Sequence, residues 1–208
     1  MKRQSGLFFT VIIISSLILS SCGKQPKEIL TEYEQAYNSH DVSKIISLYS
    51  DNVVLDLSIL SKLKGKEELR NYAEYDSVMN SQIKISDIAT SDNQSMFVMS
   101  LTNDLYRTMG IDTAKYSMSF TIEGGKITKM SGSTTWETDS KIQNFSKKFM
   151  LWAAKEKLDE LNQLMPDGRF NYNAENAKKY LDLVLEYKLN NSNTTIKEPE
   201  KKNANPHH

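Results

Sequence analysis

The chain has a single cysteine, Cys22, among its 208 residues, so no disulfide can form within it. It has three histidines, and two of these are the last two residues. No group of histidine, cysteine and carboxylate residues has the spacing of a metal-ligand set. The glycine patterns of phosphate-binding and dinucleotide-binding loops are also missing. We therefore expect no metal and no cofactor, and a fold that is held together by its apolar core.

An excess of charge of either sign is missing too, because 26 basic side chains are balanced by 26 acidic ones. Removal of residues 1–21 would take away Lys2 and Arg3 and no acidic residue, which leaves 24 basic and 26 acidic side chains. Without a basic field, the chain is not expected to bind nucleic acid. Charge alone indicates no other partner.

A long hydrophobic run occurs near the amino end of the sequence. Lys2 and Arg3 precede a stretch over residues 7–19 that is almost wholly apolar. A helix needs roughly 20 apolar residues to cross a bilayer core, so this stretch is too short for a permanent span. A charged start followed by a short apolar segment is typical of a signal peptide.

The end of this segment, Leu19-Ser20-Ser21-Cys22, resembles the lipobox of bacterial lipoproteins. The resemblance implies cleavage before Cys22 and transfer of a diacylglyceryl group to its thiol. Two or more acyl chains hold a protein stably on a bilayer, so the anchor would be permanent. The alternative is an ordinary secretory signal, which would leave an unpaired thiol in an oxidising compartment. The lipoprotein interpretation predicts a membrane-anchored protein of the bacterial cell envelope that faces the periplasm or the exterior.

Hydrophobic periodicity divides the chain into segments. Beyond Leu189 almost no apolar residue occurs, which is typical of disorder. The predicted segments are a lipoprotein signal peptide (1–21), a lipidated tether (22–26), a main domain (27–138), a C-terminal helical extension (139–189) and a disordered tail (190–208).

The main domain is predicted to open with helices. One helix is expected from Pro26, a favourable first helical position, and a second is expected after Asp41, which can cap it. Residues 53–57 have the pattern of a strand, and a loop over 58–64 leads to a third helix after Gly65. Its inward face is predicted to carry Leu69, Tyr72 and Ala73.

From Gln82 onward the period changes to two, which predicts strands. The alternation is clearest over residues 116–122, where one face is apolar and the other carries hydroxyl groups. Gly124 and Gly125 can both adopt positive φ, so they predict a tight hairpin into a return strand over 127–136. The domain is therefore expected to contain an antiparallel sheet of long strands.

The extension is predicted to form a pair of helices. Asp139 or Ser140 can cap the first, and Asn173 can cap the second. An aromatic stripe at helical spacing lies on the first helix and consists of Phe145, Phe149 and Trp152. The stripe is interpreted as core that packs the extension on the domain, and the alternative is an exposed groove for a partner protein.

Three short sequence segments resemble those of the nuclear transport factor 2-like superfamily, which includes ketosteroid isomerases and SnoaL-like cyclases. They are Tyr37-Asn38-Ser39-His40-Asp41, Leu48-Tyr49-Ser50-Asp51-Asn52-Val53 and Gly65-Lys66-Glu67-Glu68-Leu69-Arg70. The resemblance covers residues 27–138. It implies an α+β fold in which a cone-shaped, curved antiparallel sheet wraps around the long third helix. Members bind ligands or do chemistry in the opening of the cone, and some dimerise through the sheet, so a homodimer is possible here.

The resemblance places the catalytic base of the isomerases at an apolar position in this chain. Aligned from Tyr49 and Asp51, the base falls on Leu57. Asp56 could replace it only by a shift of one residue, which turns a strand side chain to the opposite face. The candidate residues for the lining of the pocket are Asp56, Tyr75, Asp104, Tyr116 and Trp136.

The leading hypothesis is a non-enzymatic protein, anchored at Cys22, whose cone binds a small apolar ligand or another envelope protein. Leu57 at the position of the base favours this hypothesis. The alternative is an exported enzyme of the isomerase or cyclase type, in which Asp56 would abstract a proton next to a carbonyl group.

Overall fold

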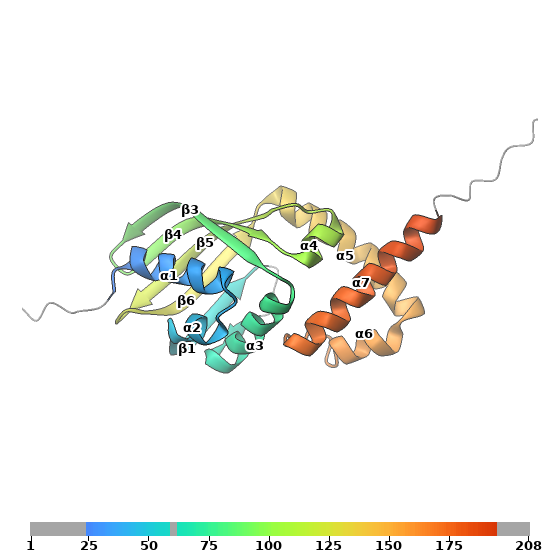
Figure 1. Ribbon diagram of the computed structural model, residues 1–208, viewed down its shortest axis with the longest axis horizontal. Coiled ribbons are helices and arrows are strands. Elements are labelled where there is room, and N and C mark those ends of the chain that lie inside the picture. Colours follow the sequence, from blue (N-terminus) through green and yellow to red (C-terminus); the bar gives the residue numbers. More distant parts are fainter. Residues whose placement is uncertain (1–23, 59–61, 195–208) are drawn as a thin grey trace, which may run out of the picture.

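The computed structural model describes residues 24–58 and 62–194, and side chains as far as residue 191 (Figure 1). The predicted signal peptide, the lipidation site at Cys22 and most of the predicted tail lie outside the described residues. Within the described residues, no helix combines the length and apolar character that a membrane span requires.

Three helices precede most of the sheet: α1 (Pro26–Asn38), α2 (Val42–Ser47) and α3 (Gly65–Val78). The Asp41 side chain accepts a hydrogen bond from the Lys44 N–H and caps α2, as predicted. Gly65 begins α3 with φ of +77°, a value that favours glycine. The inward face of α3 includes Leu69 and Ala73 as predicted, and it continues through Tyr75 and Asp76.

In the part of the chain that the structure describes, the sheet has six strands in the order β2-β1-β6-β5-β4-β3 and arches over α1 and α3 (Figure 1). β1 runs parallel to β6, with Leu57 opposite Gly132, and the other neighbouring pairs are antiparallel. The long connection between β1 and β6 permits this parallel pairing. The predicted α+β class and curved sheet are therefore confirmed. The strands are β1 (Tyr49–Leu57), β2 (Leu63–Lys64), β3 (Gln82–Ser91), β4 (Gln94–Thr102), β5 (Ala114–Glu123) and β6 (Lys126–Thr134).

The helices of the second half differ from the sequence prediction in three ways. A short helix that was not predicted, α4 (Asp104–Met109), interrupts the strands; Asn103 caps it and Gly110 ends it with φ of +81°. α5 (Trp136–Glu156) begins where the return strand was expected to end, because Thr135 caps it. The predicted first helix of the extension also breaks at Lys157. The remaining elements are α6 (Leu158–Leu164) and α7 (Ala174–Thr194), which passes the predicted boundary at Leu189.

Among the residues with described side chains, the buried ones form two cores. The first fills the cone between the sheet and α1, α2 and α3, with Tyr33, Phe97 and Phe120 in edge-to-face contact. The second lies between α3, α4 and the C-terminal helices, and Phe149 at its centre is 1% exposed. Phe145 and Trp152 are half-buried in the same core, so the aromatic stripe packs the extension on the domain.

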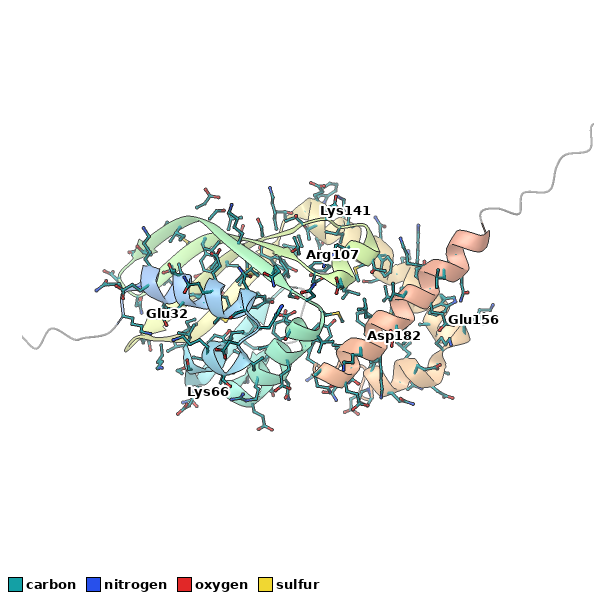
Figure 2. The ribbon with its side chains drawn as sticks, viewed as in Figure 1. Glu32, Lys66, Arg107, Lys141, Glu156 and Asp182 are labelled. Carbon is teal, nitrogen blue, oxygen red and sulfur yellow. The ribbon has the colours of Figure 1, made fainter. Side chains whose placement is uncertain are left out.

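Charged side chains cover the outer surface, including those of Glu32, Lys66, Arg107 and Lys141 (Figure 2). Each of these four forms an ion pair with a neighbour. Exposed pairs of this kind contribute only about 0–1 kcal/mol each. The two apolar cores are therefore the main source of stability.

Candidate functional site: a cavity at the mouth of the cone

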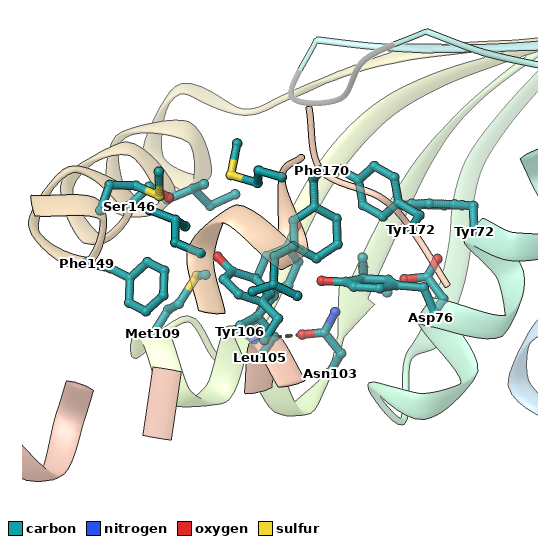
Figure 3. A pocket seen from close by; sticks show the side chains of 18 residues that line it. Tyr72, Asp76, Asn103, Leu105, Tyr106, Met109, Ser146, Phe149, Phe170 and Tyr172 are labelled. Carbon is teal, nitrogen blue, oxygen red and sulfur yellow. Dashed lines mark hydrogen bonds between the residues drawn. The ribbon is translucent and has the colours of Figure 1, made fainter. Parts of the chain in front are cut away.

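A cavity of about 260 Å³ lies where the mouth of the cone meets the C-terminal helices (Figure 3). We call it the mouth cavity. α3, the end of β4 and α4 supply one wall, with Tyr72, Asp76 and Tyr106 among the lining residues. α5, α6, α7 and the segment between α6 and α7 supply the other wall, which includes Phe149 and Tyr172. The site is thus formed jointly by the domain and its extension.

Asp76 is the acidic side chain of the lining, and it is 4% exposed. The Tyr37 hydroxyl donates a hydrogen bond to its Oδ2 at 2.5 Å, and the Ser81 hydroxyl donates to its Oδ1 at 3.4 Å. Burial raises the pKa of the carboxyl group to about 7, although hydrogen bonds from Tyr37, Ser81 and Tyr72 act in the opposite direction. Asp76 can therefore change its protonation state near neutral pH.

Asn103 connects this carboxylate to α4. Its side-chain oxygen accepts a hydrogen bond from the Tyr106 N–H at 2.7 Å, which caps α4 (Figure 3). Its side-chain nitrogen donates to Ser81 Oγ at 3.3 Å, and Ser81 in turn donates to Asp76. The start of α4 and the carboxylate on α3 therefore belong to one hydrogen-bond network.

Tyrosine rings surround the carboxylate. Tyr172 contacts Tyr72 and Tyr75 edge to face, with ring centroids 5.3 and 5.2 Å apart. Burial raises the pKa of the Tyr72 and Tyr75 hydroxyls well above the usual value, and it raises that of Tyr106 to about 12. These phenols remain neutral over the physiological range, so they can donate or accept hydrogen bonds without adding charge.

The interior of the cone itself is nearly full. A second cavity there has a volume of about 30 Å³, which is about the share of one water molecule. Tyr33, Tyr49, Met99 and Met118 occupy the space around it. The larger space is therefore at the mouth of the cone, under the extension, and not inside the sheet.

The five residues that were predicted to line the pocket lie in different parts of the structure. Tyr75 lines the mouth cavity, and Tyr116 lines the small inner cavity, where its hydroxyl shares a hydrogen bond with Tyr106. Asp56 lies on the surface with its side chain 47% exposed and paired with Lys62 at 2.9 Å. The remaining two, Asp104 and Trp136, also lie outside both cavities.

Asp104 and Trp136 are displaced by helices that were not expected at these positions. Asp104 is the first residue of α4 and forms an exposed ion pair with Arg107. Trp136 is the first residue of α5 and is 84% exposed. Trp136 was predicted to end the return strand, and Asp104 was named from composition alone; the structure places neither residue in the lining of the two cavities.

Successive side chains of β1 point to opposite faces of the sheet. Leu57 is buried and lines the inner cavity, whereas its neighbour Asp56 points to the opposite face. The position that resembles the isomerase base is therefore apolar and internal, and the carboxylate beside it is external. This arrangement offers no support for Asp56 as a catalytic base.

Asp76 is not among the predicted site residues, although the sequence contains a signal for it. Asp76 follows Leu69 by seven residues, Tyr72 by four and Ala73 by three. Residues at these spacings share one face of a helix, and that face was predicted to point inward. An acidic residue on a buried helical face is uncommon, and it would have identified the site residue.

No group of three or more His, Cys, Asp or Glu side chains within the described ranges is placed to hold a metal ion. The mouth cavity thus offers one carboxylate, several neutral hydroxyl groups and a largely apolar wall. The fold and the site together define an α+β cone with a ligand-sized cavity at its mouth.

Residues 30–130 match the family model described as the SnoaL-like domain. The match ends before α5, so the C-terminal helices lie outside it. The match therefore supports a resemblance to this family over that part of the chain. No match is found among curated proteins.

Solved structures of low sequence identity are similar to about half of the chain. An NTF2-like protein of unknown function from Cytophaga hutchinsonii is 15% identical with a TM-score of 0.45, over 52% of this chain and 88% of that one. A putative ketosteroid isomerase from Kribbella flavida is 10% identical with a TM-score of 0.45, over 52% and 76%. The epoxide hydrolase/cyclase-like enzyme SalBIII, of pyran ring formation in salinomycin, is 20% identical with a TM-score of 0.47, over 54% and 92%.

Proposed function

We propose that the protein is a binding protein whose mouth cavity holds a small, mainly apolar organic molecule. The observation that carries this proposal is the cavity itself, which is lined jointly by the domain and the extension and contains one buried carboxylate. Mainly apolar cavities with a few polar groups are the usual form of small-molecule sites.

The size of the cavity limits the ligand. Its volume of about 260 Å³ is slightly below the roughly 300–1,000 Å³ of typical small-molecule sites. A ligand with one or two fused rings, or a short branched chain, matches this volume better than a steroid does. The polar groups near Asp76 would fix the orientation of the ligand, and Phe149 and Leu164 would contact its apolar part.

The proposal is tested by filling the cavity. Ser146 lines it from α5 and is half-buried, so Ser146→Phe would place a ring in the space. Lys147→Phe is the matched control, because Lys147 is exposed on the same helix. We expect 2-naphthol to bind the wild type and the control with one-to-one stoichiometry in calorimetry, and Ser146→Phe to weaken binding at least tenfold. Equal binding by all three proteins would exclude the mouth cavity as the binding site.

A second candidate function, proton transfer next to a carbonyl group, is favoured by one observation. Asp76 has a pKa near 7 and lies in a cavity with a tyrosine hydroxyl in hydrogen-bond contact, as a general acid or base requires. The test is the exchange of α-protons of 2-tetralone in D₂O, followed by NMR. Exchange above the buffer rate that Asp76→Asn abolishes would establish an enzyme, and exchange at the buffer rate would favour the binding protein.

We also propose that the protein is anchored to a membrane of the bacterial cell envelope through acyl chains on Cys22. The lipobox-like sequence supports this location, and Cys22 is the sole cysteine, so a labelled acyl group has one possible thiol. We expect Cys22→Ser to lose incorporation of a labelled fatty acid and to leave the membrane fraction, whereas Ser21→Ala retains both. Recovery of the Cys22→Ser protein with membranes at the wild-type level would contradict the anchor.

A further inference from the structure

The lining of the mouth cavity contains an acidic side chain but no basic one. Among the eighteen described residues that line it, Asp76 is the only acidic one, and none is Lys, Arg or His. None of these lining residues takes part in an ion pair with another described residue. A ligand that enters the cavity therefore meets one potential negative charge and no basic side chain.

Aromatic rings form much of the remaining wall. Phe170 contacts Tyr75 and Tyr180 with ring centroids 5.6 and 5.2 Å apart, and Tyr180 contacts Phe149 at 5.6 Å. These contacts link one ring to the next around the cavity. The ring-bearing residues of the lining are Tyr72, Tyr75, Tyr106, Phe149, Phe170, Tyr172 and Tyr180.

We propose that the ligand is a small organic cation, an amine or a quaternary ammonium compound, held among the aromatic rings with Asp76 as its counter-ion. This inference rests on the proposed binding function and names the chemical class of its ligand. The faces of aromatic rings attract cations, and groups of such rings are the usual site for ammonium ions that cannot donate hydrogen bonds. The carboxylate of Asp76, which is 4% exposed, adds a charge of the opposite sign at a buried position, where electrostatic attraction is stronger than in water.

The other charge classes fit the cavity less well. An anion would be placed near Asp76 without a basic partner, and its loss of hydration would not be compensated. A neutral ligand would leave the ionised carboxylate without a counter-ion above neutral pH. A cation compensates the buried charge, so its binding and the ionisation of Asp76 support each other.

This coupling predicts a pH dependence of affinity. The groups that face Asp76 are tyrosines from every element around it, and these stay neutral below about pH 10. A permanent cation binds the ionised form, so its affinity should rise about tenfold per pH unit below 7 and level off above it. The tyrosines are Tyr33 and Tyr37 from α1, Tyr49 from β1, Tyr72 and Tyr75 from α3, Tyr106 from α4, Tyr116 from β5 and Tyr172 from the segment between α6 and α7.

The experiment compares choline with 3,3-dimethyl-1-butanol, a neutral molecule of nearly the same shape. Calorimetry on the full-length chain at pH 8 is expected to show at least tenfold tighter binding of choline. Asp76→Asn should remove this preference, whereas Asp56→Asn removes a surface carboxylate and should preserve it. Tyr172→Leu should also lower the affinity for choline at least fivefold, with an intact Asp76, and a cooperative unfolding transition would show that each variant is folded.

The outcomes separate this inference from the function on which it rests. If the neutral alcohol or 2-naphthol binds at the site blocked by Ser146→Phe and choline binds no tighter than the alcohol, the cavity binds ligands but the cationic class is wrong. If no probe binds, both proposals fail. A preference for choline that survives Asp76→Asn would also overturn the role of the carboxylate.

Discussion

Asp76 stands out at the scale of single residues because a carboxylic acid is buried there without a basic partner among its hydrogen-bond contacts. Its oxygens accept from Tyr37 and Ser81, so the group is satisfied by hydrogen bonds and not by an ion pair. Burial favours the neutral acid, and this preference links the protonation of Asp76 to the stability of the fold.

The folded state raises the pKa of Asp76 from 3.8 to about 7 and so binds its proton more tightly than the unfolded state does. The contribution of this group to stability is therefore complete below pH 4 and is lost as the pH rises to about 7. By the relation of ~1.4 kcal/mol per pKa unit, the change is at most about 4 kcal/mol. We expect Asp76→Asn to gain stability relative to the wild type between pH 4.5 and pH 8, measured by urea unfolding.

Asp56→Asn is the control for this measurement, because Asp56 is exposed and its pair with Lys62 is at the surface. Its difference from the wild type should stay within about 0.5 kcal/mol at both pH values. A difference between Asp76→Asn and the wild type that does not change with pH would show that Asp76 has an ordinary pKa in the folded protein.

At Gly132 on β6, the neighbouring strand leaves no room for a side chain. A Cβ atom there would lie 2.3 Å from Met118 Sδ and 2.8 Å from the Ser117 carbonyl oxygen. The Met118 side chain can move, but the backbone oxygen cannot move without distorting β5. We expect Gly132→Ala to lower the free energy of unfolding by about 1–3 kcal/mol.

Ser133→Ala is the neighbouring control, since Ser133 is exposed and accepts a change of side chain without a clash. Equilibrium unfolding in urea would compare the two variants under one set of conditions. Equal stability of Gly132→Ala and the wild type would show that the sheet adapts freely at this position.

At the scale of elements, α5 joins the extension to the domain through Phe149, which is 1% exposed and contacts Trp152, Tyr180 and Tyr187. Removal of a buried phenylalanine side chain commonly costs about 3–5 kcal/mol. We expect Phe149→Ala to lose stability in this range and also to weaken ligand binding, because the residue lines the mouth cavity.

Leu151→Ala on the same helix is the matched control, because Leu151 is 67% exposed. Its stability should remain within about 0.5 kcal/mol of the wild type. Similar losses from both substitutions, measured by urea unfolding, would mean that the buried face of α5 differs from the one described.

At the scale of the whole molecule, the second core contains side chains from α3 and α4 as well as from the C-terminal helices. Because this core spans the boundary between the cone and the extension, we expect them to unfold together. Both tryptophans, Trp136 and Trp152, lie on α5, so tryptophan fluorescence reports on the extension. Far-ultraviolet circular dichroism reports on the whole chain.

The two signals are expected to give the same midpoint in urea. An earlier fluorescence transition would show that the extension detaches while the cone stays folded. In that case the mouth cavity would open without global unfolding, and the role of the second core in joining the two parts would be refuted.

Much of the fold follows from local sequence pattern. The cap at Asp41, the glycine at the start of α3 and the alternation over residues 116–122 each act through neighbouring residues, and the structure agrees with all three. The helix α4 and the first residue of α5 were missed because single capping residues, Asn103 and Thr135, decide where these helices begin. Such caps are common polar residues, and they are hard to distinguish from turns in the sequence.

The sequence by itself determined the α+β class, the inward face of α3 and the lipobox-like segment at Cys22, since each depends on residues that are close along the chain. Only the tertiary structure decided which acid lies in the cavity and where the cavity is. Asp76 accepts a hydrogen bond from Tyr37 on α1, and Tyr172 from the segment between α6 and α7 packs on Tyr75. These contacts join distant segments, and local periodicity carries no information about which distant faces meet.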